Sequence, residues 1–188
     1  MSHNKPPEPW HSFLIEVDAL LTEEVYLRCL GGFVIKQLYG LPRVTSDVDT
    51  LEITPQDQRQ LLVEKAGQGS ELHQKHKIYL DIVTVCDHPD SYENRLTEMF
   101  PGVYNHLRLF ALEVHDLVLA KLRRNNHRDR EDVKFLAKKV PLDTKILKER
   151  YEKELRPYLA NQAHDDLTMK LWIEMIEEDR ATTSQEGL

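Results

Sequence analysis

Three aspartates in the first half of the chain have the type and spacing needed to bind a divalent cation. Asp47 and Asp49 lie two residues apart, and Asp81 interrupts a second apolar segment, Leu80–Ile82. Residues two apart on a strand point to the same face, so a neighbouring strand would bring Asp81 beside the other two. Crowded carboxylates repel one another unless a cation neutralises them, and hard oxygen ligands suit Mg²⁺. The pattern predicts a metal site for phosphoryl or nucleotidyl transfer.

A double glycine, Gly31-Gly32, precedes a helical pattern over residues 33–39. Glycine lets the backbone approach a ligand closely, and a helix N-terminus offers free N–H groups to phosphate. A pair of glycines on its own also fits a plain tight turn. For the three aspartates the alternative is a structural role. Each could be a helix cap or a surface group, and Asp81 could form a salt bridge to Arg43 or Lys36.

Taken together, these segments resemble the nucleotidyltransferase superfamily typified by DNA polymerase β. The resemblance is carried by Gly31-Gly32, by Arg43-x-Thr45-x-Asp47-x-Asp49 and by Asp81 within a later apolar strand. It extends over most of residues 20–140, and the likeness is greatest to small bacterial abortive-infection type nucleotidyltransferase toxins. The expected reaction moves a nucleoside monophosphate from an NTP to an acceptor and releases pyrophosphate.

The resemblance also implies roles for individual residues. Asp47 and Asp49 would bind two Mg²⁺ ions and the nucleotide phosphates. Asp81 would bind one metal ion and help to activate the acceptor hydroxyl. The nucleotide-binding positions would be Gly31-Gly32, which line the phosphates, and Arg43.

A second constellation lies in the helical part of the chain, where Lys121 is followed by Arg128-Asp129-x-x-Asp132. Lys121 falls on or beside the apolar stripe of its helix, which fits a lysine whose stem covers apolar surface. It also fits a cation directed at the acids and a bound triphosphate. The resembling toxins carry a similar Lys and Arg-Asp-x-x-Asp segment, which favours a catalytic Lys121 and makes Asp129 and Asp132 candidate nucleotide-binding residues. The alternative for the two acids is an N-cap and a first-turn acid.

A small basic cluster, Arg123-Arg124 with His127-Arg128, lies near a loop in the same region. It could contact the nucleotide or an RNA acceptor, although mixed local charges of this kind are usually only solvated. The chain as a whole carries a net charge of -7. Long-range attraction to bulk nucleic acid is therefore not expected.

The elements that must position these residues indicate an α+β fold. A small mixed β-sheet flanked by helices, as in the nucleotidyltransferase fold, is expected over 10–112, followed by a C-terminal helical bundle over 113–180. Strands are predicted at 48–53, 76–85 and 107–112. Helices are predicted at about 13–21, 33–39, 55–66, 91–99, 114–124, 129–139, 143–159 and 164–179, with Thr54 as N-cap and Pro55 at the first position of the third.

The remaining features concern the setting of the protein. The first nine residues lack an apolar signal core, no run approaches the length of a membrane span, and the chain has only two cysteines. We therefore expect a soluble, cytoplasmic protein without membrane association.

The acceptor is left open by the sequence: tRNA, another RNA, a protein or a small molecule would each serve. A role as the toxin of a toxin–antitoxin pair, with an antitoxin as partner, is one hypothesis, and the oligomeric state is not predicted. The alternative is a catalytically degenerate nucleotide-binding or antitoxin-like protein. A metal-dependent nuclease is disfavoured, because no acid-x-Lys pattern follows Asp81, where the strand reads Asp81-Ile-Val-Thr.

Overall fold

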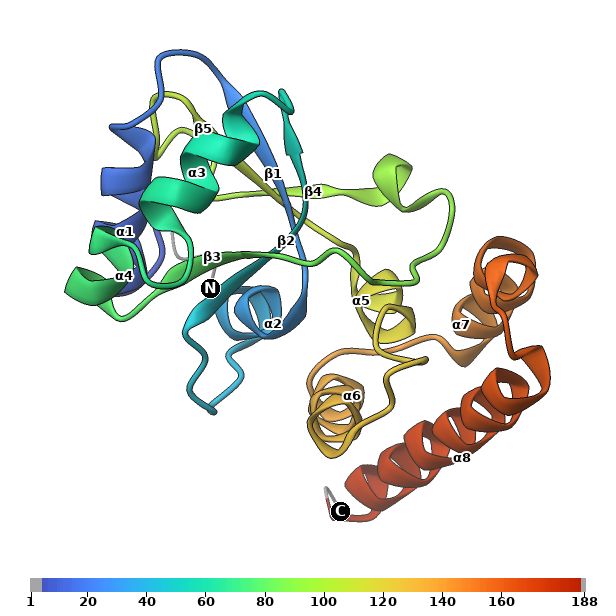
Figure 1. Cartoon of the computed structure of the whole chain (residues 1–188). Helices are drawn as coiled ribbons and strands as arrows, with labels where there is room; N and C mark the ends of the chain where they lie inside the picture. The colour runs from blue at the N-terminus through green and yellow to red at the C-terminus, as the bar shows by residue number, and fades with distance from the viewer. Residues whose placement is uncertain (1–4, 187–188) are drawn as a thin grey trace. The chain divides into compact units, whose positions relative to one another are not determined.

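The computed structural model describes residues 5–186, with side chains in the last helix as far as Asp179. It divides into two compact units (Figure 1). The first comprises the chain up to Val85 together with Leu96–Leu112. The second comprises Cys86–Arg95 and the chain from Glu113 onwards, so each unit is built from two segments of the sequence.

The first unit contains a five-stranded mixed sheet, which confirms the predicted α+β class. Its strands are β1 (Val25–Cys29), β2 (Asp47–Thr54), β3 (Tyr79–Ile82), β4 (Thr97–Met99) and β5 (Leu107–Ala111). The spatial order is β3-β2-β1-β5-β4. β1 is antiparallel to β2 and parallel to β5, whereas β2 and β3 run parallel. β4 is antiparallel to β5.

Four helices accompany this sheet: α1 (Trp10–Asp18), α2 (Gly31–Tyr39), α3 (Gln58–Ala66) and α4 (Glu71–His76). α1, α3 and α4 pack against one another, and α3 also packs on β2 and β3 (Figure 1). Alternation along β1 buries Val25, Leu27 and Cys29 and leaves Tyr26 and Arg28 more exposed. An antiparallel or mixed sheet can bury one face and leave polar side chains on the other.

The second unit is helical and contains α5 (Val114–Leu119), α6 (His127–Lys139), α7 (Thr144–Arg150) and α8 (Gln162–Glu186). A π-helical turn, Tyr151–Leu155, and a 3₁₀ turn, Arg156–Tyr158, follow α7. α6 and α7 both pack on α8, whose buried residues include the apolar Met169, Trp172, Ile173 and Ile176. Among the described residues, no helix combines the length and apolarity that crossing a bilayer requires.

One predicted helix begins later than expected, and another is wrong as an element. Thr54 is not an N-cap: it ends β2, opposite Tyr26 of β1, and α3 begins only at Gln58. The segment 91–99 is not a helix either. It forms a 3₁₀ turn, Tyr92–Arg95, and then β4, because its last residues pair with β5.

Other boundaries differ from the predicted ones for local reasons. α5 ends at Leu119 instead of near residue 124, since Lys121 and Leu122 donate backbone hydrogen bonds three residues back rather than four. β3 is only four residues long. The chain before it forms α4, which Ser70 caps by accepting a hydrogen bond from the His73 backbone N–H at 3.1 Å. α8 continues to Glu186, past the predicted end at 179.

Candidate active site

The three predicted metal-binding aspartates lie on adjacent parallel strands of the first unit. Asp47 begins β2, Asp49 follows two residues later, and Asp49 is in register with Asp81 of β3. Neighbouring strands are about 4.8 Å apart and alternate residues about 6.6 Å apart along a strand. Val48 and Thr50 point into the core. Asp47, Asp49 and Asp81 therefore lie on the less buried face of these two strands, as the sequence predicted.

The double glycine forms the start of α2 and lies directly beside Asp49. The Gly32 backbone N–H donates a hydrogen bond of 3.3 Å to Asp49 Oδ2. Gly31 has φ +69°, and a Cβ atom added there would lie only 1.9 Å from the same oxygen. Two independent features therefore require glycine at position 31: the positive φ of the backbone and the space that the Asp49 carboxylate occupies.

The loop between α2 and β2 brings a cation to this helix N-terminus. A Cβ atom on Gly32 would lie 3.1 Å from Arg43 Nη2 and 3.3 Å from Thr45 Oγ1, so both side chains lie against this glycine. Lys36 Nζ braces the loop by donating to the Leu41 and Arg43 carbonyl oxygens at 3.2 and 3.1 Å. A guanidinium beside a helix N-terminus is an arrangement suited to phosphate oxygens.

The donor set fits a hard cation, because it consists of carboxylate oxygens alone. Asp47 Oδ1 accepts a hydrogen bond from the Thr45 hydroxyl, and Asp49 Oδ2 accepts one from Gly32. In these orientations, the described part of the chain holds no group of three His, Cys, Asp or Glu side chains already gathered for a metal ion. Cation binding would therefore require carboxylates to turn on a backbone that already places them together.

Tyr79 is a further residue of this face, which the sequence motif does not include. It lies opposite Asp47 in the β2–β3 register and two residues before Asp81, so it shares the acidic face. Burial, and then the negative charge of the three aspartates, raises the pKa of its hydroxyl above the usual value. The His73 ring packs edge-on against it, with ring centroids 4.9 Å apart. The period-two spacing from Asp81 was the signal that could have revealed it.

The second predicted constellation lies within the helical unit, where Lys121, Asp129 and Asp132 are buried and Arg128 is exposed. The Lys121 side chain is 5% exposed, and its Nζ lies 2.8 Å from Asp132 Oδ2 and 3.4 Å from Asp129 Oδ1. Arg124 also bonds to Asp129. Asp129 forms a capping box with Asn126 at the start of α6. A direct contact of Lys121 with a nucleotide would require it to leave both carboxylates, and its catalytic role stays a prediction.

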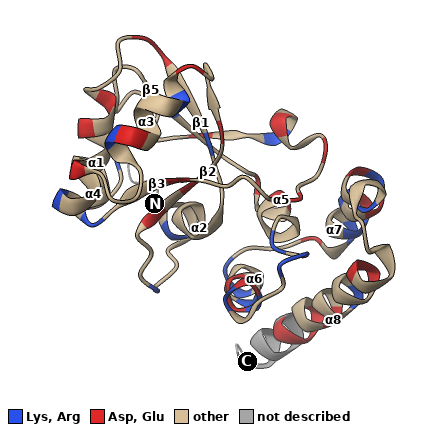
Figure 2. Ribbon diagram, in the orientation of Figure 1, with Lys and Arg blue, Asp and Glu red and all other residues tan. Residues whose placement is uncertain are grey.

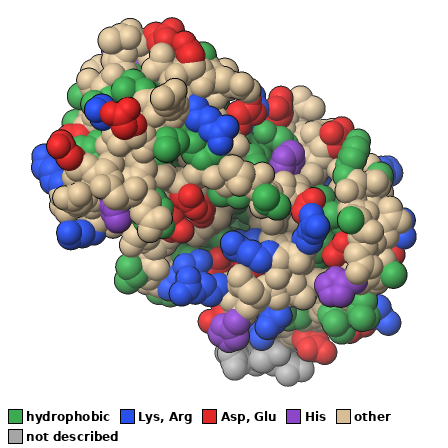
Figure 3. All heavy atoms as spheres, in the orientation of Figure 1, with side chains coloured by type: hydrophobic (Ala, Val, Ile, Leu, Met, Phe, Trp, Pro, Cys, Tyr) green, Lys and Arg blue, Asp and Glu red, His purple; other side chains and the backbone are tan. Residues whose placement is uncertain are grey.

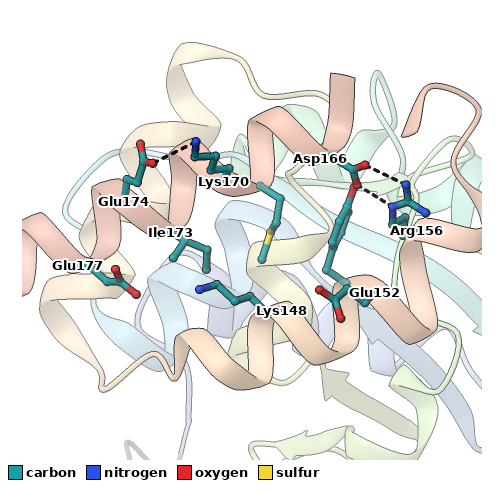
Figure 4. Close-up of a pocket in the computed structure, with 10 residues that line it drawn as sticks. Lys148, Glu152, Arg156, Asp166, Lys170, Ile173, Glu174 and Glu177 are labelled. Atoms are coloured by element: carbon teal, nitrogen blue, oxygen red, sulfur yellow. Dashed lines mark hydrogen bonds and ion pairs between the residues drawn. The ribbon is translucent and has the colours of Figure 1, made fainter. Parts of the chain in front are cut away.

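A separate cavity of about 560 Å³ lies in the second unit (Figure 4). Its lining includes the apolar side chains of Tyr151, Met169 and Ile173. Three cations and four acids complete it, and two oppositely charged pairs, Arg156–Asp166 and Lys170–Glu174, lie 2.7 and 4.0 Å apart. Such mutual pairing leaves no surplus of positive charge for a triphosphate, so this cavity does not compete with the acidic face as a nucleotide site.

Comparison with protein families gives one match over most of the chain. The family is described as nucleotidyltransferase of unknown function (DUF6036), and its model matches residues 17–180. The match includes the double glycine, Arg43, the three aspartates of the sheet and the Lys121 cluster. Comparisons with curated proteins and with solved structures gave no match.

Proposed function

Since this chain belongs to the nucleotidyltransferase family DUF6036, we propose that it is a Mg²⁺-dependent enzyme that transfers a nucleoside monophosphate from an NTP to an acceptor hydroxyl. The observation that carries the proposal is the shared face of Asp47, Asp49 and Asp81, with Asp49 in register with Asp81 and hydrogen bonded to the α2 N-terminus. Aspartates that served only as isolated surface groups would require neither this register nor this hydrogen bond.

Each group has a role that follows from its position. The α2 N-terminus and the Arg43 guanidinium bind phosphate oxygens, and the absence of a side chain at Gly31 leaves room for the Asp49 carboxylate beside the backbone. Asp47, Asp49 and Asp81 would hold the Mg²⁺ ions. When bound, Mg²⁺ supplies charge neutralisation of the triphosphate and lowers the pKa of a hydroxyl that it contacts.

The reaction conserves atoms and charge without any further reactant. The acceptor oxygen forms a bond to the α-phosphorus, and the bond from that phosphorus to the bridging oxygen of the β-phosphate breaks. Pyrophosphate leaves with that oxygen. The proton of the acceptor hydroxyl passes to the Asp81 carboxylate, the most exposed of the three acids.

The direct test is transfer of label from each of the four α-³²P NTPs to total RNA or to a protein extract, with and without Mg²⁺. We expect label with the wild type, and a loss of on the order of 10³-fold in Asp49→Asn, because metal-ligand contacts supply several kcal/mol of transition-state stabilisation. Asp57→Asn, which removes an exposed acid before α3, is the matched control and should retain activity.

Two results separate the proposal from its alternatives. Metal-dependent NTP binding in calorimetry, without transfer to any acceptor, would favour the degenerate nucleotide-binding protein. Transfer that survives in both Asp47→Ala and Asp49→Asn would remove the acidic face from the mechanism. The toxin hypothesis has its own measurement: induced expression should stop growth with the wild type and not with Asp49→Asn.

A further inference from the structure

The connection between α5 and α6 carries a concentration of positive charge that the proposed chemistry does not use. We call residues Arg123–Arg130 the basic turn; it contains four arginines, His127 and a single acid, Asp129. The chain as a whole has a net charge of -7, so this segment has the opposite sign to the molecule. The blue segments between the α5 and α6 labels in Figure 2 mark it.

The positive charges of the basic turn point outward and its negative charge points inward. The side chains of Arg123, Arg124 and His127 are 52%, 66% and 79% exposed, and Arg128 and Arg130 are also exposed. Asp129 is fully buried. The surface that the turn offers to solvent is therefore cationic, although the face seen in Figure 3 has side chains of both signs.

The backbone of the basic turn is held in place from several directions. Asn125 adopts a left-handed conformation with φ +41°, and its Oδ1 accepts a hydrogen bond of 3.1 Å from Trp172 Nε1. Asn126 and Asp129 exchange hydrogen bonds across the first turn of α6. A loop fixed in this way loses little conformational entropy when it binds a partner.

Two of the exposed arginines, Arg123 and Arg128, are available to an external anion. Arg123 pairs with Asp87 at 2.8 Å, but an ion pair this exposed contributes little stability and exchanges readily with a phosphate. Arg128 makes no hydrogen bond or ion pair with any residue that the structure describes. Guanidinium groups bind phosphate oxygens through paired N–H donors.

We propose that the basic turn binds the phosphodiester backbone of a nucleic acid, which would be the acceptor of the transfer reaction; that last step rests on the proposed function. A row of phosphates matches several guanidinium groups along one short segment, whereas a single small anion would use only one or two. The acidic remainder of the chain repels the same backbone and thereby directs it to this turn.

Binding is measured by fluorescence anisotropy with a labelled single-stranded RNA 12-mer and the DNA of the same sequence, from 50 to 200 mM KCl and without NTP. We expect Arg123→Gln/Arg128→Gln to weaken binding about tenfold or more at 50 mM KCl. Loss of two phosphate contacts should also reduce the slope of log affinity against log salt by about 1.4. Both changes are at exposed positions and should leave the fold intact.

The matched control, Arg59→Gln/Lys65→Gln, removes the same charge from exposed positions of α3. An equal loss in this control, or no binding of either oligonucleotide at 50 mM KCl, overturns the inference. Tighter binding of RNA than of DNA identifies RNA as the source of the backbone, and the reverse identifies DNA. Because no NTP is present, failure of transfer in a protein that still binds RNA would count against the proposed function alone.

Discussion

At the scale of single residues, the proposed site depends on the contact between Gly31 and Asp49. Gly31 has a positive φ, and the Asp49 carboxylate occupies the position that a Cβ atom would need. The same carboxylate accepts the Gly32 N–H at 3.3 Å. Asp49 is therefore hydrogen bonded to the α2 N-terminus and also lies in register with Asp81. It links the phosphate-binding and metal-binding parts of the proposed site.

Gly31→Ala should lower both stability and activity. The left-handed conformation alone costs a non-glycine residue about 1–2 kcal/mol, and the displaced Asp49 adds to that cost. Gly40→Ala separates the two effects, because Gly40 has φ +77° with nothing within 4 Å of an added Cβ atom. Urea unfolding should show the larger loss in Gly31→Ala, and NTP transfer should fall at least tenfold in that variant only. Equal losses in the two variants would contradict the Gly31–Asp49 contact.

At the scale of elements, α5 and α6 are joined by a buried cluster of opposite charges. Lys121 follows α5, and Asp129 and Asp132 lie on the first turns of α6. Both aspartates are fully buried. A buried charge is tolerated only when it is paired, so removal of the cation leaves two carboxylates with too little compensation.

Lys121→Met should therefore destabilise the protein by about 3–5 kcal/mol, as is usual when one partner of a buried pair is lost. Chemical denaturation followed by tryptophan fluorescence would measure it, because Trp172 bonds to the Asn125 side chain next to this cluster. Lys134→Met, an exposed change on α6, is the control and should alter stability by less than about 0.5 kcal/mol. Normal stability with lost activity would instead support the catalytic role that the sequence predicts for Lys121.

At the scale of the whole molecule, a second charge network connects the two sequence segments of the helical unit. Arg95, from the segment 86–95, bonds to Asp116 at 2.8 Å and to Glu154 at 2.7 Å. Arg150 bonds to Asp116 and to Glu113, the N-cap of α5. Folding of this unit therefore depends on carboxylates that must stay ionised.

Glu113 gives this dependence a defined pH range. Burial alone would raise its pKa, but His115 and Arg150 outweigh burial and lower the pKa from 4.5 to about 2. A carboxylate with a lowered pKa stabilises the folded state above its unfolded pKa of about 4.5, and the effect is lost as the pH falls to about 2. At about 1.4 kcal/mol per pKa unit, the contribution is on the order of 3 kcal/mol.

Glu113→Gln should thus be less stable than the wild type at pH 7, and the two should converge as the pH falls from about 4.5 towards 2. Urea titrations at a series of pH values measure the difference. Glu149→Gln, which removes an exposed acid paired with Lys153 on the surface, serves as the control and should follow the wild type at every pH. A constant difference between Glu113→Gln and the wild type down to pH 2 would contradict the assignment.

The sequence by itself determined the class of the fold and predicted the residues of the candidate site. Spacing of two residues is enough to place Asp47 and Asp49 on one face of a strand, and glycine types are enough to indicate a close backbone approach. The apolar patterns also located β2, β5, α2 and α6 to within a few residues. These are local properties, which are set by neighbours along the chain.

Only the tertiary structure decided which distant residues meet. Two helices separate β2 from β3 in the sequence, and the pairing of these strands sets the register of Asp49 with Asp81 and the position of Tyr79 opposite Asp47. The pairing of β4 with β5 likewise depends on a contact that no local pattern specifies. Helical periodicity predicts on which side of the helix Lys121 lies, but not which group that side contacts. The sequence pattern is therefore the same for a lysine that contacts a nucleotide and for one that contacts two buried acids, as Lys121 does. The physical reason is that local pattern fixes backbone conformation and face, whereas the partners of a buried charge are chosen by packing.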